Sequence, residues 1–127
     1  MKVGGNPSAK WGALVLAPAK PEVGDNVNII QHPGGGPKRV AIRNNLIYRA
    51  NYPIVSYFTD TDGGSSGSPV CTDDWNVVAM HRAWKAVPNV QFQGKPVPCV
   101  NEGVQVAAIL EDLKQNHNAL YTEITAV

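Results

Sequence analysis

Cysteine is scarce in this chain, which holds only Cys71 and Cys99 among its 127 residues. Two thiols and three scattered histidines match no spacing that zinc sites use, so neither a metal nor another cofactor is expected. A disulfide would require the fold to bring the two thiols together, and the sequence leaves that open. We expect both cysteines to be free thiols, which favours a cytoplasmic location for the protein. The sequence does not determine that location further.

An excess of either charge is also lacking, since 11 lysines and arginines stand against 10 aspartates and glutamates and the formal net charge is +1. Nucleic-acid binding needs a basic surface, so no nucleic-acid partner is expected. No apolar run reaches the roughly 20 residues that a membrane helix needs. The N-terminus shows no charged stretch followed by an apolar one, as a secretory leader would. The composition therefore predicts a soluble chain without a membrane partner.

Short apolar segments separated by turn residues are abundant instead, and the length fits one domain over residues 1–127. Many short strands joined by turns favour a closed all-β barrel. The final segment changes period, because Val106, Ile109, Leu110 and Leu113 form one apolar helical face, which predicts a C-terminal helix over 105–117. The predicted strands are 13–16, 27–31, 38–48, 54–58, 68–71, 77–82 and 103–106.

The most informative segment reads Gly-Ser-Ser-Gly-Ser-Pro over residues 64–69. The segments 57–59 and 75–81 on either side alternate β-forming residues, so the serines lie on a tight connection inside an all-β unit. A plain Gly/Ser-rich turn is the alternative interpretation, because such turns are common between strands. The six residues resemble the Gly-x-Ser-Gly-[Gly/Ser]-Pro signature of trypsin-like serine proteases.

This resemblance implies that Ser66 is a nucleophile. A serine hydroxyl needs a base to take its proton, and the oxyanion that forms on the substrate needs preorganised donors. Glycine at position 64 can adopt backbone angles that are forbidden to other residues, and so bring its amide beside that of Ser66. We therefore expect the amides of Gly64 and Ser66 to hold the oxyanion of a peptide or protein substrate.

Other segments extend the resemblance over most of the chain. Residues 23–38, which read Val-Gly-Asp-Asn-Val-Asn-Ile-Ile-Gln-His-Pro-Gly-Gly-Gly-Pro-Lys, are similar to a run in the second barrel of bacterial-type trypsin-like peptidases. Segments 75–81 and 101–106 resemble later strands of the same barrel. The resemblance implies a six-stranded antiparallel barrel, the second of the chymotrypsin-like fold, followed by the C-terminal helix.

The family places its general-base histidine and the orienting aspartate on a first barrel, which has no counterpart here. The resemblance thus implies an N-terminal barrel, in the same or another chain, as a required partner, and an isolated chain that is inactive. His32 belongs to the structural pattern of the family, and His117 follows the predicted helix, where the helix dipole suits a cation. Neither is expected to act as the base.

The resemblance gives conflicting indications about the S1 pocket. His81 and Thr61 match residues with which glutamyl endopeptidases of this family bind an acidic side chain, through a ring donor and a hydroxyl. Asp60 instead matches the position at which trypsin selects lysine or arginine, although it could also be an ordinary turn residue. We favour acidic specificity. The segment Arg82, Ala83 and Trp84 would form the edge along which a peptide pairs as an added strand.

Two other functions are compatible with the sequence. One is a catalytically silent half-barrel that binds peptides or proteins along 82–84. The other is a self-sufficient hydrolase whose base is His81 or a residue from a second copy. The surface that a first barrel would cover should be apolar, so we also expect the isolated chain to form a homodimer or to aggregate.

Overall fold

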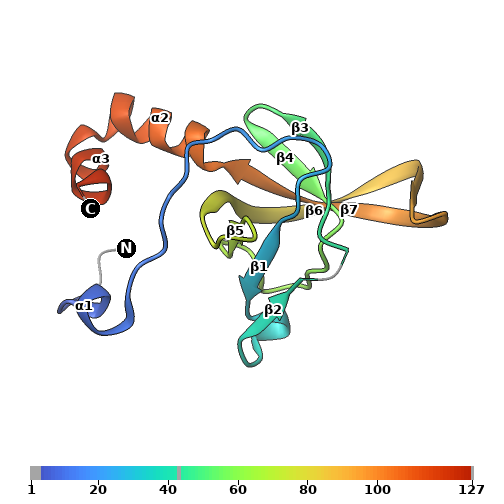
Figure 1. Ribbon diagram of the computed structural model, residues 1–127, viewed down its shortest axis with the longest axis horizontal. Coiled ribbons are helices and arrows are strands. Elements are labelled where there is room, and N and C mark those ends of the chain that lie inside the picture. Colours follow the sequence, from blue (N-terminus) through green and yellow to red (C-terminus); the bar gives the residue numbers. More distant parts are fainter. Residues whose placement is uncertain (1–3, 43, 127) are drawn as a thin grey trace.

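A computed structural model describes residues 4–42 and 44–126 (Figure 1). Strands dominate, as expected for an all-β fold. No helix in the described ranges is both long and apolar enough to span a bilayer. In chain order the elements are α1 (Pro7–Trp11), β1 (Asn28–Gln31), the 3₁₀ turn η1 (Pro33–Gly35), β2 (Arg39–Ala41), β3 (Ile47–Asn51), β4 (Ile54–Tyr57), β5 (Pro69–Cys71), β6 (Val77–Phe92), β7 (Lys95–Gln105), α2 (Val106–Asn116) and α3 (Asn118–Thr125).

The strands form one antiparallel sheet in the order β2-β1-β5-β6-β7-β4-β3. Its two end strands, β2 and β3, follow each other in the chain, and the sheet curls so that the segments leading into β1 and β3 come together. A bridge between Asn26 and Leu46, and a hydrogen bond of 2.6 Å from the Val27 amide to the Asn45 carbonyl, join the β1 side to the β3 side. The expected strand over 38–48 is interrupted here, because Asn44 has a φ of 54°.

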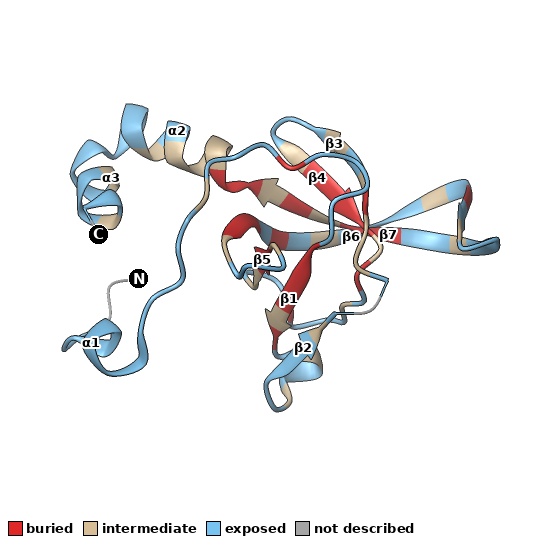
Figure 2. Cartoon of the chain, in the orientation of Figure 1, coloured by how far each residue is buried: buried red, intermediate tan, exposed pale blue. Residues whose placement is uncertain are grey.

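The core lies inside this curled sheet. Figure 2 shows its buried residues concentrated in β1, β4, β5 and the parts of β6 and β7 that pair with β5 and β4. Burial of each large apolar side chain stabilises the fold by about 1.5–3 kcal/mol, so this core holds the strands of the sheet together. The cluster consists of Val27, Ile29, Ile47, Val55, Tyr57, Val70, Val78 and Ala79.

The segment 13–16, predicted as a strand, makes only one bridge, between Leu16 and Val77. The Val77 amide donates to the Val15 carbonyl, and the Ala17 amide donates to the Val77 carbonyl, each over 2.8 Å. Pro18 follows at once and has no N–H for a ladder, which explains why the pairing stops. The prediction of a strand was therefore wrong at this place.

β6 and β7 are much longer than the predicted strands 77–82 and 103–106, and they form a hairpin that extends past the other strands in Figure 1. The hairpin turns at Gln93 and Gly94, whose φ values of 52° and 75° are typical of a type I′ turn. The ring of Phe92, next to this turn, packs on Phe58 with a centroid distance of 4.6 Å. Most of the added hairpin is exposed (Figure 2).

The helix predicted over 105–117 corresponds to α2, which is followed by α3. Val106 is buried at the start of α2 and packs with Cys71 and Val77, while Leu110 covers them. Both cysteines are free: Cys71 is buried, which raises the pKa of its thiol, and Cys99 is exposed.

Candidate active site

Two consecutive turns shape the loop between β4 and β5. The Ser65 amide donates to the Asp62 carbonyl and the Ser68 amide donates to the Ser65 carbonyl, each over 3.1 Å. Gly64 and Gly67 occupy the third position of these turns with φ values of 94° and 86°, as a type II turn requires. The loop therefore needs the two glycines that flank the central serines.

The central serines face opposite ways. Ser65 is buried, whereas Ser66 is exposed and donates its hydroxyl to the Arg82 carbonyl over 3.2 Å. No carboxylate or imidazole of residues 4–42 and 44–126 hydrogen-bonds Ser66. His32 Nδ1 lies 3.0 Å from the Gly36 carbonyl, and His117 ends α2. Within the described part of the chain, Ser66 therefore has no hydrogen-bonded group that could act as its general base.

The backbone beside Ser66 carries unused donors. The Gly63 carbonyl accepts a hydrogen bond of 2.6 Å from the Gly34 amide. Because N–H and C=O of a trans peptide point in opposite directions, this bond turns the Gly64 N–H away from Gly34. Neither the Gly64 nor the Ser66 amide donates a hydrogen bond to any described residue.

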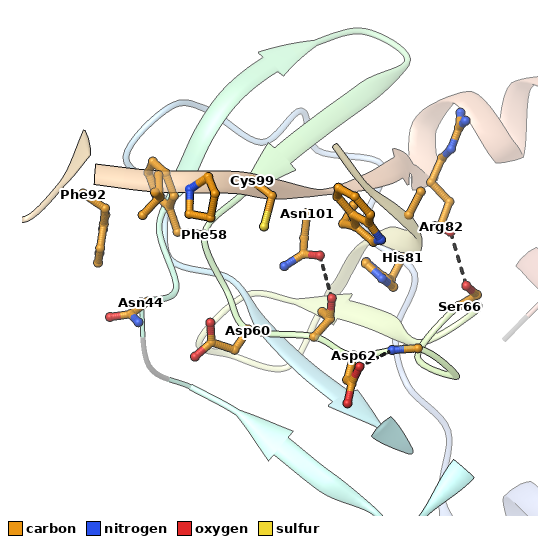
Figure 3. A pocket seen from close by; sticks show the side chains of 16 residues that line it. Asn44, Phe58, Asp60, Asp62, Ser66, His81, Arg82, Phe92, Cys99 and Asn101 are labelled. Atoms are coloured by element: carbon orange, nitrogen blue, oxygen red, sulfur yellow. Dashed lines mark hydrogen bonds between the residues drawn. The ribbon is translucent and has the colours of Figure 1, made fainter. Parts of the chain in front are cut away.

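A cavity of about 700 Å³ opens beside Ser66 (Figure 3). It has a polar end with Ser66 and His81, and an apolar end where Phe58 and Phe92 pack together. All the site residues predicted from the sequence line it except Gly64, which lies in the adjoining turn. The lining consists of Asn44, Phe58, Asp60, Thr61, Asp62, Gly63, Ser66, His81, Arg82, Ala83, Trp84, Phe92, Val97, Pro98, Cys99 and Asn101.

His81 is the buried histidine of this wall, with 4 % of its surface exposed. Its Nδ1 lies 2.7 Å from the hydroxyl of Tyr57, which is wholly buried. Burial raises the pKa of Tyr57, so the phenol keeps its proton. The buried hydroxyl has no other acceptor among the described residues, so it donates to Nδ1. In the neutral ring the hydrogen then resides on Nε2, which has no partner among the described residues. Burial also lowers the pKa of His81, which favours this neutral form.

Thr61 does not offer its hydroxyl proton to the cavity in the way the sequence suggested. It donates to Asn101 Oδ1 over 2.6 Å, while Asn101 Nδ2 donates to the Thr59 carbonyl over 2.8 Å. The Thr61 oxygen remains available as an acceptor. Asn101 was missed by sequence reasoning, since only its place opposite Trp84 in the β6–β7 register brings it into the site.

Asp60 is exposed at the rim of the cavity. In Figure 3 its carboxylate lies on the side of Asn44, apart from His81 and Ser66. Its backbone carbonyl accepts a hydrogen bond from Gln31 Nε2 over 2.9 Å, while its side chain has no hydrogen-bond partner among the described residues. The structure therefore brings Asp60 and His81 to one cavity but places them at different parts of its wall.

Arg82, Ala83 and Trp84 lie on the part of β6 that β5 does not cover. The pairing of β5 with β6 reaches only Pro69 and Met80, and β7 occupies the other side. The segment 82–84 is thus a sheet edge directly beside the serine, as strand addition by a peptide requires.

The curled antiparallel sheet, the serine on its glycine-supported turn and the cavity beside it define a chymotrypsin-like serine peptidase fold. Residues 1–80 match the trypsin-like peptidase domain, so this chain belongs to that family. A solved structure of Glu endopeptidase in complex with MPD is similar, with a TM-score of 0.65 and 20 % identity, over 88 % of this chain and 50 % of that one.

Two relatives are similar in sequence. The uncharacterized protein y4fB of Sinorhizobium fredii is 38 % identical over 147 aligned positions, which cover 88 % of this chain and 22 % of the relative. The secreted RxLR effector protein 73 of Plasmopara viticola is 35 % identical over 86 positions, covering 60 % of this chain and 21 % of the relative. The chain thus spans about a fifth of the length of both relatives and half of the Glu endopeptidase chain.

Proposed function

We propose that this chain is the nucleophile-bearing barrel of a serine endopeptidase. Ser66 attacks the scissile carbonyl of a peptide, and the amides of Gly64 and Ser66 hold the oxyanion. The observation that carries this proposal is the combination of an exposed serine and two unused amides on consecutive turns at the mouth of a cavity. A plain surface turn would need neither the free donors nor the cavity.

The base comes from outside these 127 residues, on a first barrel that contributes histidine and aspartate. Ser66 donates to a carbonyl and not to an imidazole, which supports an external base. The half coverage of the Glu endopeptidase chain also supports a partner barrel. An apolar groove of about 290 Å³ between β5, β6 and the C-terminal helices, lined by Leu14, Leu16, Met80 and Ile124 among others, offers a surface for it.

The S1 pocket selects an acidic side chain. His81 presents a ring N–H from a buried position, and a carboxylate is the acceptor that such a donor binds most strongly. Asp60 lies at the exposed rim, so it is solvated and does not exclude an anion from the inner wall. Direct use of His81 as the base is less well supported, because its Nδ1 is engaged by Tyr57 and no hydrogen bond links the ring to Ser66.

A fluorophosphonate probe followed by intact mass tests the proposal, on the chain alone and on the assembled enzyme, meaning the chain together with the first barrel. We expect labelling only in the assembled enzyme, and its loss in Ser66→Ala. Ser68→Ala is the matched control, since it removes another hydroxyl of the same loop and should label normally. Labelling of the isolated chain would instead support a self-sufficient hydrolase, and no labelling in either form would support a silent binding module.

A further inference from the structure

The side-chain amide of Gln31, at the end of β1, holds the nucleophile loop at two points. Its Oε1 accepts a hydrogen bond from the Ser65 hydroxyl over 2.5 Å, and its Nε2 donates to the Asp60 carbonyl over 2.9 Å. Gln31 and Ser65 are both buried, with 5 % and 0 % of their surfaces exposed. A buried polar group without a partner is costly, so the loop position that satisfies both bonds is strongly favoured.

The residues after Gln31 contact the same loop through their backbone. The Gly34 amide binds the Gly63 carbonyl, which orients the peptide that carries the Gly64 N–H. A Cβ at position 64 would lie 3.0 Å from the Gly35 nitrogen and 3.2 Å from the His32 carbonyl, so the two loops are in direct contact. Segment 31–35 therefore contacts the loop at Ser65 and at residues on its N-terminal side.

We propose that Gln31 is a positioning residue of the oxyanion site. By drawing the Ser65 side chain inward, it turns the next residue, Ser66, outward and fixes the direction of its amide. By binding the Asp60 carbonyl, it fixes the start of the same loop. This inference rests on the proposed function, because the amides it concerns are those of Gly64 and Ser66.

Gln31→Met and Ser65→Ala test the proposal, separately and together. The first removes both bonds at nearly constant volume, and the second removes one hydroxyl and is the milder change for folding. The matched control is Gln105→Met, because Gln105 is also buried and donates from Nε2 to the Ile54 carbonyl over 3.1 Å, outside the cavity. The first readout is amide hydrogen exchange at Gly34, Ser65 and Gly67 in the 127-residue chain, where these amides are hydrogen-bonded. The second is fluorophosphonate labelling of Ser66, with kcat and KM, in the assembled enzyme.

We expect exchange at these amides to become at least about tenfold faster in both single variants and to stay unchanged in Gln105→Met. Labelling and kcat should fall about tenfold or more while KM changes less than about twofold, since the amides act on the transition state. The double variant should be no worse than Gln31→Met alone. Unchanged exchange and labelling, or equal losses in Gln105→Met, would overturn the proposal.

The two proposals fail in different ways. If the unsubstituted assembled enzyme does not label, the proposed function is wrong, and the role of Gln31 is then decided by exchange alone. Faster exchange in Gln31→Met and Ser65→Ala would still support the clamp on the loop, and wild-type exchange would overturn it.

Discussion

The Tyr57 hydroxyl and His81 Nδ1 lie 2.7 Å apart in the buried wall of the cavity beside Ser66. The two side chains come from β4 and β6, which lie on either side of β7 in the sheet, so their contact spans β7. Because the buried phenol keeps its proton and has no other acceptor among the described residues, Tyr57 donates to Nδ1 and favours the Nε2–H form of the imidazole. A core tyrosine thus determines which hydrogen-bonding group His81 presents to the cavity.

Tyr57→Phe should therefore weaken selection for acidic substrates without abolishing catalysis. The substituted ring can adopt either tautomer, so the Nε2 donor is no longer enforced. We expect kcat/KM in the assembled enzyme to fall about tenfold for substrates with glutamate at P1, the size of a lost hydrogen bond to a charged group. Cleavage after alanine should change little. Tyr121→Phe on α3 is the control, and an equal loss for both substrates would contradict this role.

The stability of the chain should depend on pH through His81. Burial lowers the pKa of His81 below its ordinary value of 6.5, so the unfolded chain takes up a proton near pH 6.5 that the folded chain refuses. The unfolded state then binds more protons, and stability falls as the pH drops below about 6.5. Urea unfolding at pH 7.5 and 5.5 measures the effect.

His81→Gln should remove this difference in the urea midpoint between the two pH values, because the amide does not titrate and can still accept from Tyr57. His117→Gln, at the exposed end of α2, is the control and should keep the difference. Asp73 does not interfere, because hydrogen bonds from Asn28 and Asn26 lower the pKa of its carboxylate below 3.8, so it is ionised in both the folded and the unfolded chain at pH 5.5. A pH difference that survives in His81→Gln would show that another group is responsible.

Local patterns predicted much of the barrel and the nucleophile loop. The alternating apolar residues of 54–58 and 68–71 became β4 and β5, and the glycines around Ser66 marked its turn. These features depend only on residues that are close together in the chain, so a single sequence is enough to predict them. The hairpin extension was missed, because prolines and polar residues over 87–98 are atypical of strands and only the pairing of β6 with β7 supports them.

The supporting contacts of the site could not be predicted, because they join residues far apart in the chain. Gln31 and Ser65 are 34 residues apart, Tyr57 and His81 are 24 apart, and Thr61 and Asn101 are 40 apart. A buried tyrosine, glutamine or asparagine has no periodic signal of its own. Only the strand order tells which of them meet.

Gly64→Ala should inactivate the enzyme more than it destabilises the fold. An alanine at a φ of 94° is strained by about 1–2 kcal/mol, and its Cβ would press on the Gly35 nitrogen at 3.0 Å. We expect labelling of Ser66 in the assembled enzyme to fall about 100-fold, as when one oxyanion donor is lost.

Gly24→Ala separates the clash from the strain. Gly24 has a φ of 92° but nothing within 4 Å of an added Cβ, so Gly24→Ala should lose only the stability that the backbone strain costs, and label normally. The free energy of unfolding from urea titration and the labelling rate are compared in both variants. A labelling rate in Gly64→Ala equal to that of Gly24→Ala would show that the contact with Gly35 does not matter for the oxyanion site.

The isolated chain should associate with itself through the apolar groove beside β6. Met80, Leu14 and Leu16 line this groove and keep 43 %, 45 % and 40 % of their surfaces exposed. Contiguous apolar surface favours association, and the first barrel is expected to cover it in the assembled enzyme. Met80→Lys should therefore shift sedimentation equilibrium toward the monomer.

Val40→Lys on β2 is the control for this change, because Val40 is also exposed, at 50 %, but lies outside the groove. It should leave the association unchanged, since the added charge is the same and only the place differs. In the assembled enzyme, Met80→Lys should weaken binding of the first barrel, because a lysine ammonium loses hydration when that surface is covered. A wild-type chain that sediments as a monodisperse monomer would contradict the self-association. If the Met80→Lys chain binds the first barrel as tightly as the wild-type chain does, the contact between the barrels must lie elsewhere on the surface.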